Sequence, residues 1–69
     1  MEEMLIVTVR DIEYVLQSEP RPTGDVTPDG KIAYEANAQT IDGHPAMVYW
    51  TVAEGEKLVL ETPIFAELV

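Results

Sequence analysis

Residues 31–61 alternate apolar and polar positions in three runs, and a glycine-containing turn separates each run from the next. Such alternation is typical of β-strands that bury one face, because successive side chains point to opposite sides of a strand. Asp42-Gly43 is a preferred two-residue hairpin turn, and Glu54-Gly55 is a weaker one because Glu is a poorer first residue. The pattern therefore predicts an antiparallel meander of three strands at about 31–41, 45–53 and 57–62.

A two-residue turn at Asp42-Gly43 determines which residues face one another across the first hairpin. Ala36 is then expected opposite Tyr49, and the alternation of side chains sorts the meander into two faces. One face is the expected core and collects Ile32, Tyr34, Ala36, Ala38, Met47, Tyr49, Leu58 and Leu60. The other face collects Ala33, Glu35, Asn37, Gln39, Val48, Trp50, Val52, Lys57, Val59 and Glu61. The apolar stripe around Trp50 on this second face needs cover, either from this chain or from another molecule.

Two segments before the meander are apolar enough to join the sheet. Residues 4–10 are nearly all apolar and rich in β-branched side chains, which indicates a strand buried on both faces. Residues 11–18 fit either a short amphipathic helix capped by Asp11 or a strand that follows a bulge at Arg10-Asp11. The helix is the favoured interpretation, because it would cover one face of the sheet.

Residues 19–30 are expected to form a proline-containing loop between these segments and the meander. Pro20, Pro22 and Pro28 remove backbone donors, and the residues before them are pushed to extended conformations. The loop ends in Thr27-Pro28-Asp29-Gly30, which has the proline and glycine positions of a type I turn. Arg21 lies between two of these prolines and is a candidate contact residue, although an extended surface connector is the favoured interpretation of the segment.

The last six residues, 64–69, are too apolar for a solvated tail. Three placements fit them. They could form a short edge strand after Pro63, dock over Trp50, or contact a second copy of the chain.

Length and composition are those of a small domain without covalent staples. Sixty-nine residues predict one domain, 1–69, whose core is marginal. The chain has no cysteine and one histidine, which excludes disulfides and disfavours a structural zinc site. The fold class expected is mainly β to α+β, a small antiparallel sheet with one short helix at about 11–18. No apolar run reaches the length of a membrane span and the acidic start does not suit a secretory signal, so a cytoplasmic location is expected.

The charge balance limits the class of partner. Thirteen acidic and four basic residues give a formal net charge of −9. That balance excludes ordinary nucleic-acid binding, which needs Lys and Arg on phosphates, and disfavours anionic membrane surfaces. It favours a protein partner with a basic surface, although the same charge also serves solubility. The composition is similar to that of small acidic inhibitors that mimic DNA phosphate or occupy basic enzyme clefts, a similarity that covers no motif.

Catalytic chemistry finds little support in the sequence. His44 stands alone at a hairpin tip, and Ser18, the only serine, is not placed to pair with it. Asp25 and Asp29 lack the alternating ligands of a calcium loop, and the glycines fall singly at turns. The sequence therefore predicts a protein that is not an enzyme and that holds no cofactor and no metal.

Two functions fit these observations. The first is a non-enzymatic interaction module, such as an inhibitor or regulator, that binds a basic protein surface through Trp50, Glu35, Glu61 and Arg21. Tryptophan is enriched at the energetic centres of interfaces, although ordinary core packing explains Trp50 as well. The second is a self-associating domain, a homodimer that buries its apolar sheet face or its C-terminal strand against its copy.

Overall fold

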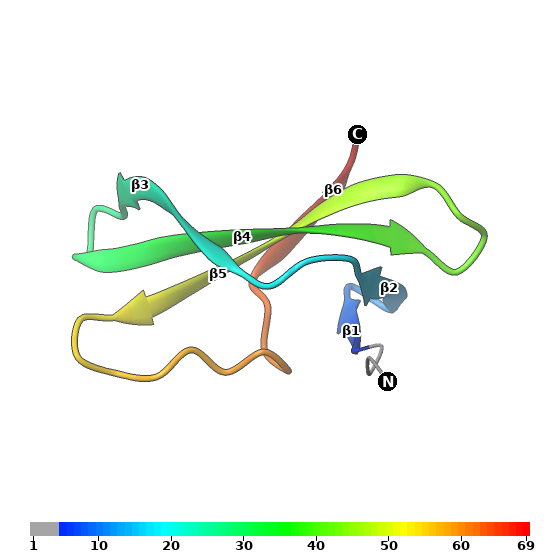
Figure 1. Ribbon diagram of the computed structural model, residues 1–69. Helices are drawn as coiled ribbons and strands as arrows, with labels where there is room; N and C mark the ends of the chain where they lie inside the picture. Colours follow the sequence, from blue (N-terminus) through cyan, green and yellow to red (C-terminus); the bar gives the residue numbers. More distant parts are fainter. Residues whose placement is uncertain (1–4) are drawn as a thin grey trace.

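The computed structural model describes residues 5–69, which form one six-stranded antiparallel sheet (Figure 1). The strands are β1 (Ile6–Val9), β2 (Ile12–Leu16), β3 (Arg21–Val26), β4 (Lys31–Thr40), β5 (Pro45–Ala53) and β6 (Phe65–Leu68). Their order is β1-β2-β4-β5-β6, and β3 pairs with β4 beside the part that β2 covers. The prediction of a mainly β, antiparallel sheet is confirmed. The strand expected over 4–10 is β1, and its first residue, Met4, lies outside the described residues.

The second segment of the chain is a strand. Arg10 and Asp11 both have positive φ, 52° and 66°, as a two-residue type I′ hairpin turn requires. The turn returns the chain along β1 as β2, which pairs with β1 on one side and with β4 on the other. The helix expected over 11–18 is therefore wrong, and the strand alternative holds with a tight turn in place of a bulge.

The loop expected over 19–30 is wrong in its central part, where β3 pairs antiparallel with β4. Arg21 faces Glu35 and Val26 faces Ile32, with a register shift between them that includes Gly24, at φ 92°. A proline is tolerated in this strand because β3 pairs on one edge only, so a missing N–H costs no ladder bond on its free side.

The β4–β5 hairpin has a register that differs by one residue from the expected one. Ala36 faces Val48, whereas the two-residue turn placed it opposite Tyr49. Because side chains alternate along a strand, a slip of one residue moves every β5 side chain to the other face relative to β4. Trp50 therefore shares a face with Ala36, and Tyr49 shares the opposite face with Glu35.

The turn after β4 explains this slip. The Gly43 N–H donates to the Thr40 carbonyl oxygen at 2.9 Å, and in this turn only Gly43 has positive φ, 92°. These are the features of a type I turn followed by a glycine bulge, which is one residue longer than the turn assumed from Asp42-Gly43. The Thr40 hydroxyl reinforces the longer turn by donating to the Asp42 carboxylate and accepting the His44 N–H, the latter at 3.0 Å.

The turn before β4 repeats the same arrangement. The Gly30 N–H donates to the Thr27 carbonyl oxygen at 2.9 Å, and Gly30 has φ 83°. The Thr27 hydroxyl donates to the Asp29 carboxylate and accepts the Lys31 N–H, the latter at 3.0 Å. Both ends of β4 are thus closed by a Thr-x-Asp-Gly turn.

We expect these two turns to make the fold sensitive to acid. The threonine hydroxyls lower the pKa of Asp29 and Asp42 below the ordinary value of 3.8. A carboxyl whose pKa is lowered by folding stabilises the folded state above its unfolded pKa, and this contribution is lost as pH falls through the folded value. The urea midpoint of the native chain should therefore fall more between neutral pH and pH below 3.8 than that of the Asp29→Asn, Asp42→Asn double variant. Equal acid sensitivity of the two proteins would contradict this account of the turns.

The third strand expected at 57–62 is not formed. The Glu56 N–H donates to the Ala53 carbonyl oxygen at 3.0 Å, and Gly55, the third residue of this turn, has φ 85°. This combination is a type II turn, whose twist splays the flanking strands instead of pairing them. The chain therefore leaves β5 as an irregular segment, residues 54–64, and returns to pair with it as β6. The edge-strand placement of residues 64–69 is confirmed.

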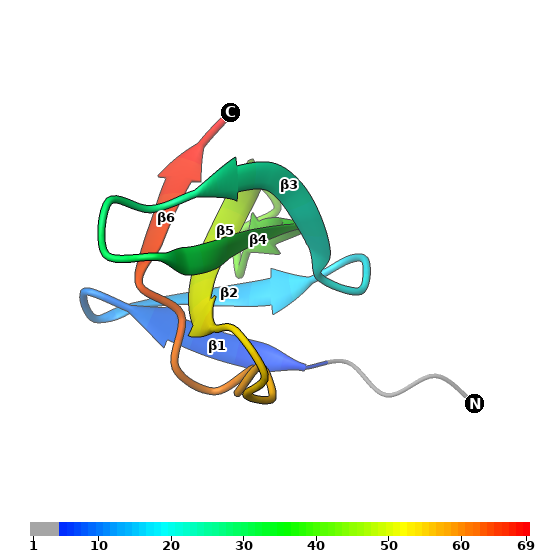
Figure 2. The same ribbon diagram turned by 90° about the vertical axis from the view of Figure 1, so that its left-hand side faces the viewer.

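The core lies between β4–β5 and the N-terminal hairpin. Figure 2 shows the β1–β2 hairpin (blue) below β4, with β5 running down across it and the irregular segment leading from the end of β5 to β6. The fully buried members of the core, all at most 9% exposed, are Val7, Val9, Tyr14, Val15, Ala36, Ala38, Ala46, Val48, Trp50 and Val52. Leu58, Leu60 and Tyr34 pack against this cluster. The predicted core is confirmed for Tyr34, Ala36 and Ala38 of β4 and for the two leucines. It is wrong for Met47 and Tyr49, and Ile32 is only half-buried.

Candidate protein-binding face

The structure brings together only two of the four residues that the sequence marked for partner contact. Arg21 and Glu35 face one another across β3 and β4, with 3.3 Å between Arg21 Nη2 and Glu35 Oε2. Glu61 is exposed in the irregular segment after β5. Trp50 is 1% exposed, and its indole N–H donates to the Leu60 carbonyl oxygen at 3.1 Å. The apolar stripe that needed cover is therefore covered by this chain, and Trp50 has no surface left for a partner.

The register places a different set of side chains on the face of the sheet that points away from Trp50. In the ladder of β4, β5 and β6, Glu35 faces Tyr49 and Tyr49 faces Phe65. Glu67 faces Met47 two pairs further along, so its side chain lies on the same side. We call this side the outer face, and we call Glu35, Tyr49, Phe65 and Glu67 the aromatic–carboxylate patch.

Three members of the patch, Tyr49, Phe65 and Glu67, are in contact. The rings of Tyr49 and Phe65 have centroids 5.8 Å apart and are tilted by 32°. The Tyr49 hydroxyl donates to Glu67 Oε1 at 2.8 Å, which holds one carboxylate at the edge of the ring pair. Phe65 is 39% exposed, so part of its ring is open to solvent. The guanidinium carbon of Arg10, from the β1–β2 turn, lies 5.9 Å from the centroid of this ring.

The carboxylates change the acidity of Tyr49. The hydrogen bond to Glu67 raises the pKa of the Tyr49 phenol above 10.0, and desolvation and the negative charges of Glu67 and Glu35 act in the same direction. The patch is thus a place of concentrated negative potential around an aromatic pair. Such a place attracts cations by charge and by the ring quadrupole together.

The titration of Tyr49 tests this geometry. With tyrosines labelled at ring Cζ, NMR should show the Tyr49 midpoint above 10.0 in the native chain. In the Glu67→Ala variant the midpoint should move back toward 10.0, because the hydrogen bond and the nearest charge are both removed. Glu54→Ala, a carboxylate in the turn after β5, is the matched control and should leave the midpoint unchanged. An unmoved Tyr49 midpoint in Glu67→Ala would show that the phenol and this carboxylate do not interact.

The surface around the patch is acidic. No charged side chain is buried in the part of the chain that the structure describes. One ion pair besides Arg21–Glu35 occurs there, Lys31 with Asp29, and the His44 imidazole lies 3.4 Å from the Asp42 carboxylate. In both cases the aspartate belongs to a Thr-x-Asp-Gly turn and its partner is the residue that follows the turn. An ion pair cancels one charge of each sign, so local pairing does not change the net charge of −9.

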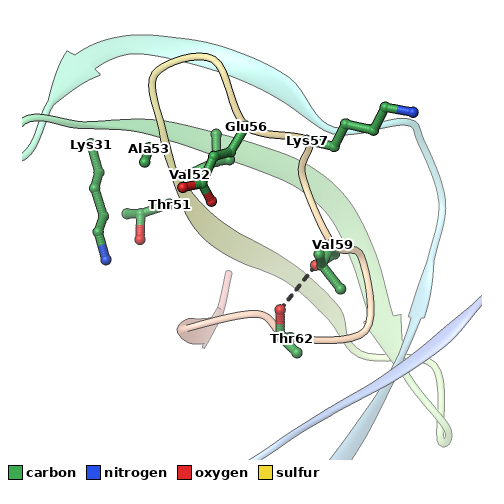
Figure 3. A pocket seen from close by; sticks show the side chains of 8 residues that line it. All are labelled: Lys31, Thr51, Val52, Ala53, Glu56, Lys57, Val59 and Thr62. Carbon is green, nitrogen blue, oxygen red and sulfur yellow. Dashed lines mark hydrogen bonds between the residues drawn. The ribbon is translucent and has the colours of Figure 1, made fainter.

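A shallow hollow at the other end of β5 is a weaker candidate site (Figure 3). It has a volume of about 230 Å³ and is lined by Lys31, Thr51, Val52, Ala53, Glu56, Lys57, Val59 and Thr62. The Thr62 hydroxyl donates to the Val59 carbonyl oxygen at 3.2 Å, and the Lys57 side chain points away from the other lining residues in Figure 3. The polar groups of the hollow thus do not converge on a common point.

Sequence reasoning missed Phe65 and Glu67 and placed Tyr49 in the core. No protein-family model, no curated protein and no solved structure matches this chain. Across residues 5–69 there is no group of three side chains that could hold a metal ion. No helix in the same residues is long and apolar enough to cross a membrane.

Proposed function

We propose that this chain is a non-enzymatic protein-binding module that binds a basic surface of another protein through its outer face. The observation that carries this proposal is the aromatic–carboxylate patch, in which two rings are in contact and carboxylates lie beside them. A lysine or arginine of a partner would meet a ring face and a carboxylate at once. Arg10 lies over Phe65 at 5.9 Å and makes, within this chain, the kind of contact proposed for the partner.

The net charge of the chain adds a long-range electrostatic attraction to the short-range contacts of this patch. Carboxylates spread over the surface attract a basic partner before contact and raise the association rate, an effect that salt screens. Short-range contacts with the rings then slow dissociation, which is where most affinity differences between related complexes arise. If the basic surface of the partner is a functional cleft, the chain would act on it as an inhibitor or regulator.

Affinity capture from an extract of the source cells tests this function. The native chain should retain a basic protein at low salt and release it at high salt. Glu67→Lys, within the patch, should weaken retention by about tenfold or more, a loss of about 1.4 kcal/mol in binding free energy. Glu67→Gln is the companion variant, because it removes the charge and keeps an acceptor for the Tyr49 hydroxyl.

Glu54→Lys is the matched control, because it changes the net charge by the same amount at a turn outside the patch. It should weaken retention only through the general field, and therefore less than Glu67→Lys does. Equal losses for the two variants would show that no dedicated patch exists. Retention of proteins that are not basic, or retention that salt does not affect, would contradict the proposed function as a whole.

A further inference from the structure

The second edge of β6 is open. β6 is the last strand in the order β1-β2-β4-β5-β6, and no other strand of residues 5–69 pairs with it (Figure 1). The Val69 N–H donates to the Pro45 carbonyl oxygen at 3.1 Å, so Val69 directs its backbone groups toward β5. In an antiparallel ladder every second residue points its backbone groups to the same edge. Counted back from Val69 in the register of β6 with β5, Ala66 and Leu68 direct their N–H and C=O groups away from the sheet. The Ile64 N–H, which donates to the Tyr49 carbonyl oxygen at 2.9 Å, lies before β6 and one residue out of this register.

Apart from its short length and the charge of Glu67, this edge has little of the protection that is usual for a free strand. Proteins block free edges with proline, lysine, bulges or covering segments, since an open edge is a template for another strand. The free edge of β3 is protected in this way by Pro22 and by the irregular pairing around Gly24. β6 has no proline, lysine or bulge, and at its end Leu68 and Val69 are 62% and 80% exposed.

We propose that the basic partner binds as an extended segment that adds a strand to the open edge of β6. This inference rests on the proposed function and specifies how the partner meets the patch. Side chains of an added strand alternate between the two faces of the sheet. Those on the outer face would lie beside Glu67 and favour lysine or arginine, and those on the inner face would lie beside Leu68 and favour β-branched apolar residues.

Charge complementarity indicates which kind of chain would bind the open edge of β6. A second copy of this chain would bring its own Glu67 and a further net charge of −9 to the same edge. An added strand rich in lysine or arginine would be attracted to this edge, because its cations would lie beside the patch and its backbone groups would pair with those of Ala66 and Leu68. A basic segment therefore fits this edge better than a second copy does.

A short capped peptide that alternates lysine and valine is the probe. At low salt it should bind and slow amide hydrogen exchange at Ala66 and Leu68, because their N–H groups become donors to the added strand. Ala66→Pro removes one outward N–H and leaves the inward bonds of β6 to β5 in place. It should weaken binding by about tenfold, since an added strand loses its bond to that N–H and meets the proline ring.

A second peptide keeps the experiment decisive if Ala66→Pro does not fold. It has the same side chains but N-methyl groups on the backbone, and it should not bind to the edge. If the N-methylated peptide binds as well as the first peptide, the added strand is refuted and the proposed function stands. The same conclusion follows if the first peptide leaves the amide exchange rates of Ala66 and Leu68 unchanged while Glu67→Lys still abolishes its binding. If neither peptide binds, the added strand is refuted, and extract capture separately decides the proposed function. A dimer in sedimentation equilibrium that Ala66→Pro dissociates would assign the edge to a second copy and overturn the inference.

Discussion

Trp50→Ala is expected to remove a large share of the free energy of unfolding. Trp50 is 1% exposed and is the largest side chain in the core. Truncating a buried Phe or Trp to Ala costs about 3–5 kcal/mol through lost burial and the cavity left behind. Domains are stable by about 0.05–0.15 kcal/mol per residue, which is roughly 3–10 kcal/mol for 69 residues. Urea unfolding followed by far-UV circular dichroism measures the loss.

Two further variants separate the causes of this loss. Trp50→Phe keeps most of the bulk but leaves the Leu60 carbonyl oxygen without the indole donor, so it should remain folded and lose about 1–3 kcal/mol. Tyr49→Ala removes the neighbouring aromatic side chain, which lies on the outer face, and should be tolerated better than Trp50→Ala. If Tyr49→Ala is the more destabilising of the two, Trp50 is not the centre of the core.

The second large effect is expected when an acid enters the buried side of β5. Val48 is 0% exposed and faces Ala36, which is also 0% exposed. Val48→Asp removes the burial of a valine side chain, worth about 1.5–3 kcal/mol, and places a carboxylate where no partner lies. Burying an unpaired ion costs several kcal/mol more. The two losses together are comparable to the free energy of unfolding of a small domain, so this variant should not fold at neutral pH.

Met47→Asp is the matched control one position earlier on the same strand. Met47 is only half-buried, and its side chain lies on the outer face with Glu67. A carboxylate there stays in water, so the variant should fold and lose far less stability, with some repulsion from Glu67. Circular dichroism and the urea midpoint of both variants give the comparison. Similar losses for Val48→Asp and Met47→Asp would mean that the two faces of β5 are not as distinct as the structure has them.

The strands that could be predicted from the sequence are those whose alternation is strong and whose turns are explicit. β4 and β5 appear with nearly the expected bounds, because a run of alternating residues ends at glycine on each side. β1 was expected from its β-branched residues. β3 was missed because its prolines argue for a loop, and this argument fails for a strand that pairs on one edge only.

The register could not be read from Asp42-Gly43 alone. Asp-Gly fits both a two-residue turn with two positive φ values and a type I turn with a glycine bulge. The threonine two positions before the aspartate distinguishes them, since its hydroxyl bonds the aspartate carboxylate and a backbone N–H of the longer turn. The same spacing at Thr27 was interpreted as a type I turn, so the signal that could have fixed the register was already present in the chain.

The error of one residue in the predicted register also explains why the aromatic–carboxylate patch was not predicted. Placing Tyr49 in the core and Trp50 outside directed attention to the wrong aromatic residue. Phe65 and Glu67 could not be placed at all, because their side depends on how β6 pairs with β5, and a type II turn had removed the expected third strand. Glu35 is the only carboxylate common to the predicted and observed faces.

The pairing of β4 with β5 is the claim on which both the core and the outer face depend, and proton NMR tests it most directly. Glu35 and Tyr49 form a non-hydrogen-bonded pair, in which the two Cα atoms lie about 4.5 Å apart and the α-protons face one another. We predict a strong nuclear Overhauser effect between the α-protons of Glu35 and Tyr49. A strong effect between the α-protons of Ala36 and Tyr49 in its place would indicate the register that a two-residue turn produces. Trp50 would then lie on the face opposite to Ala36, and the proposed binding face would be contradicted.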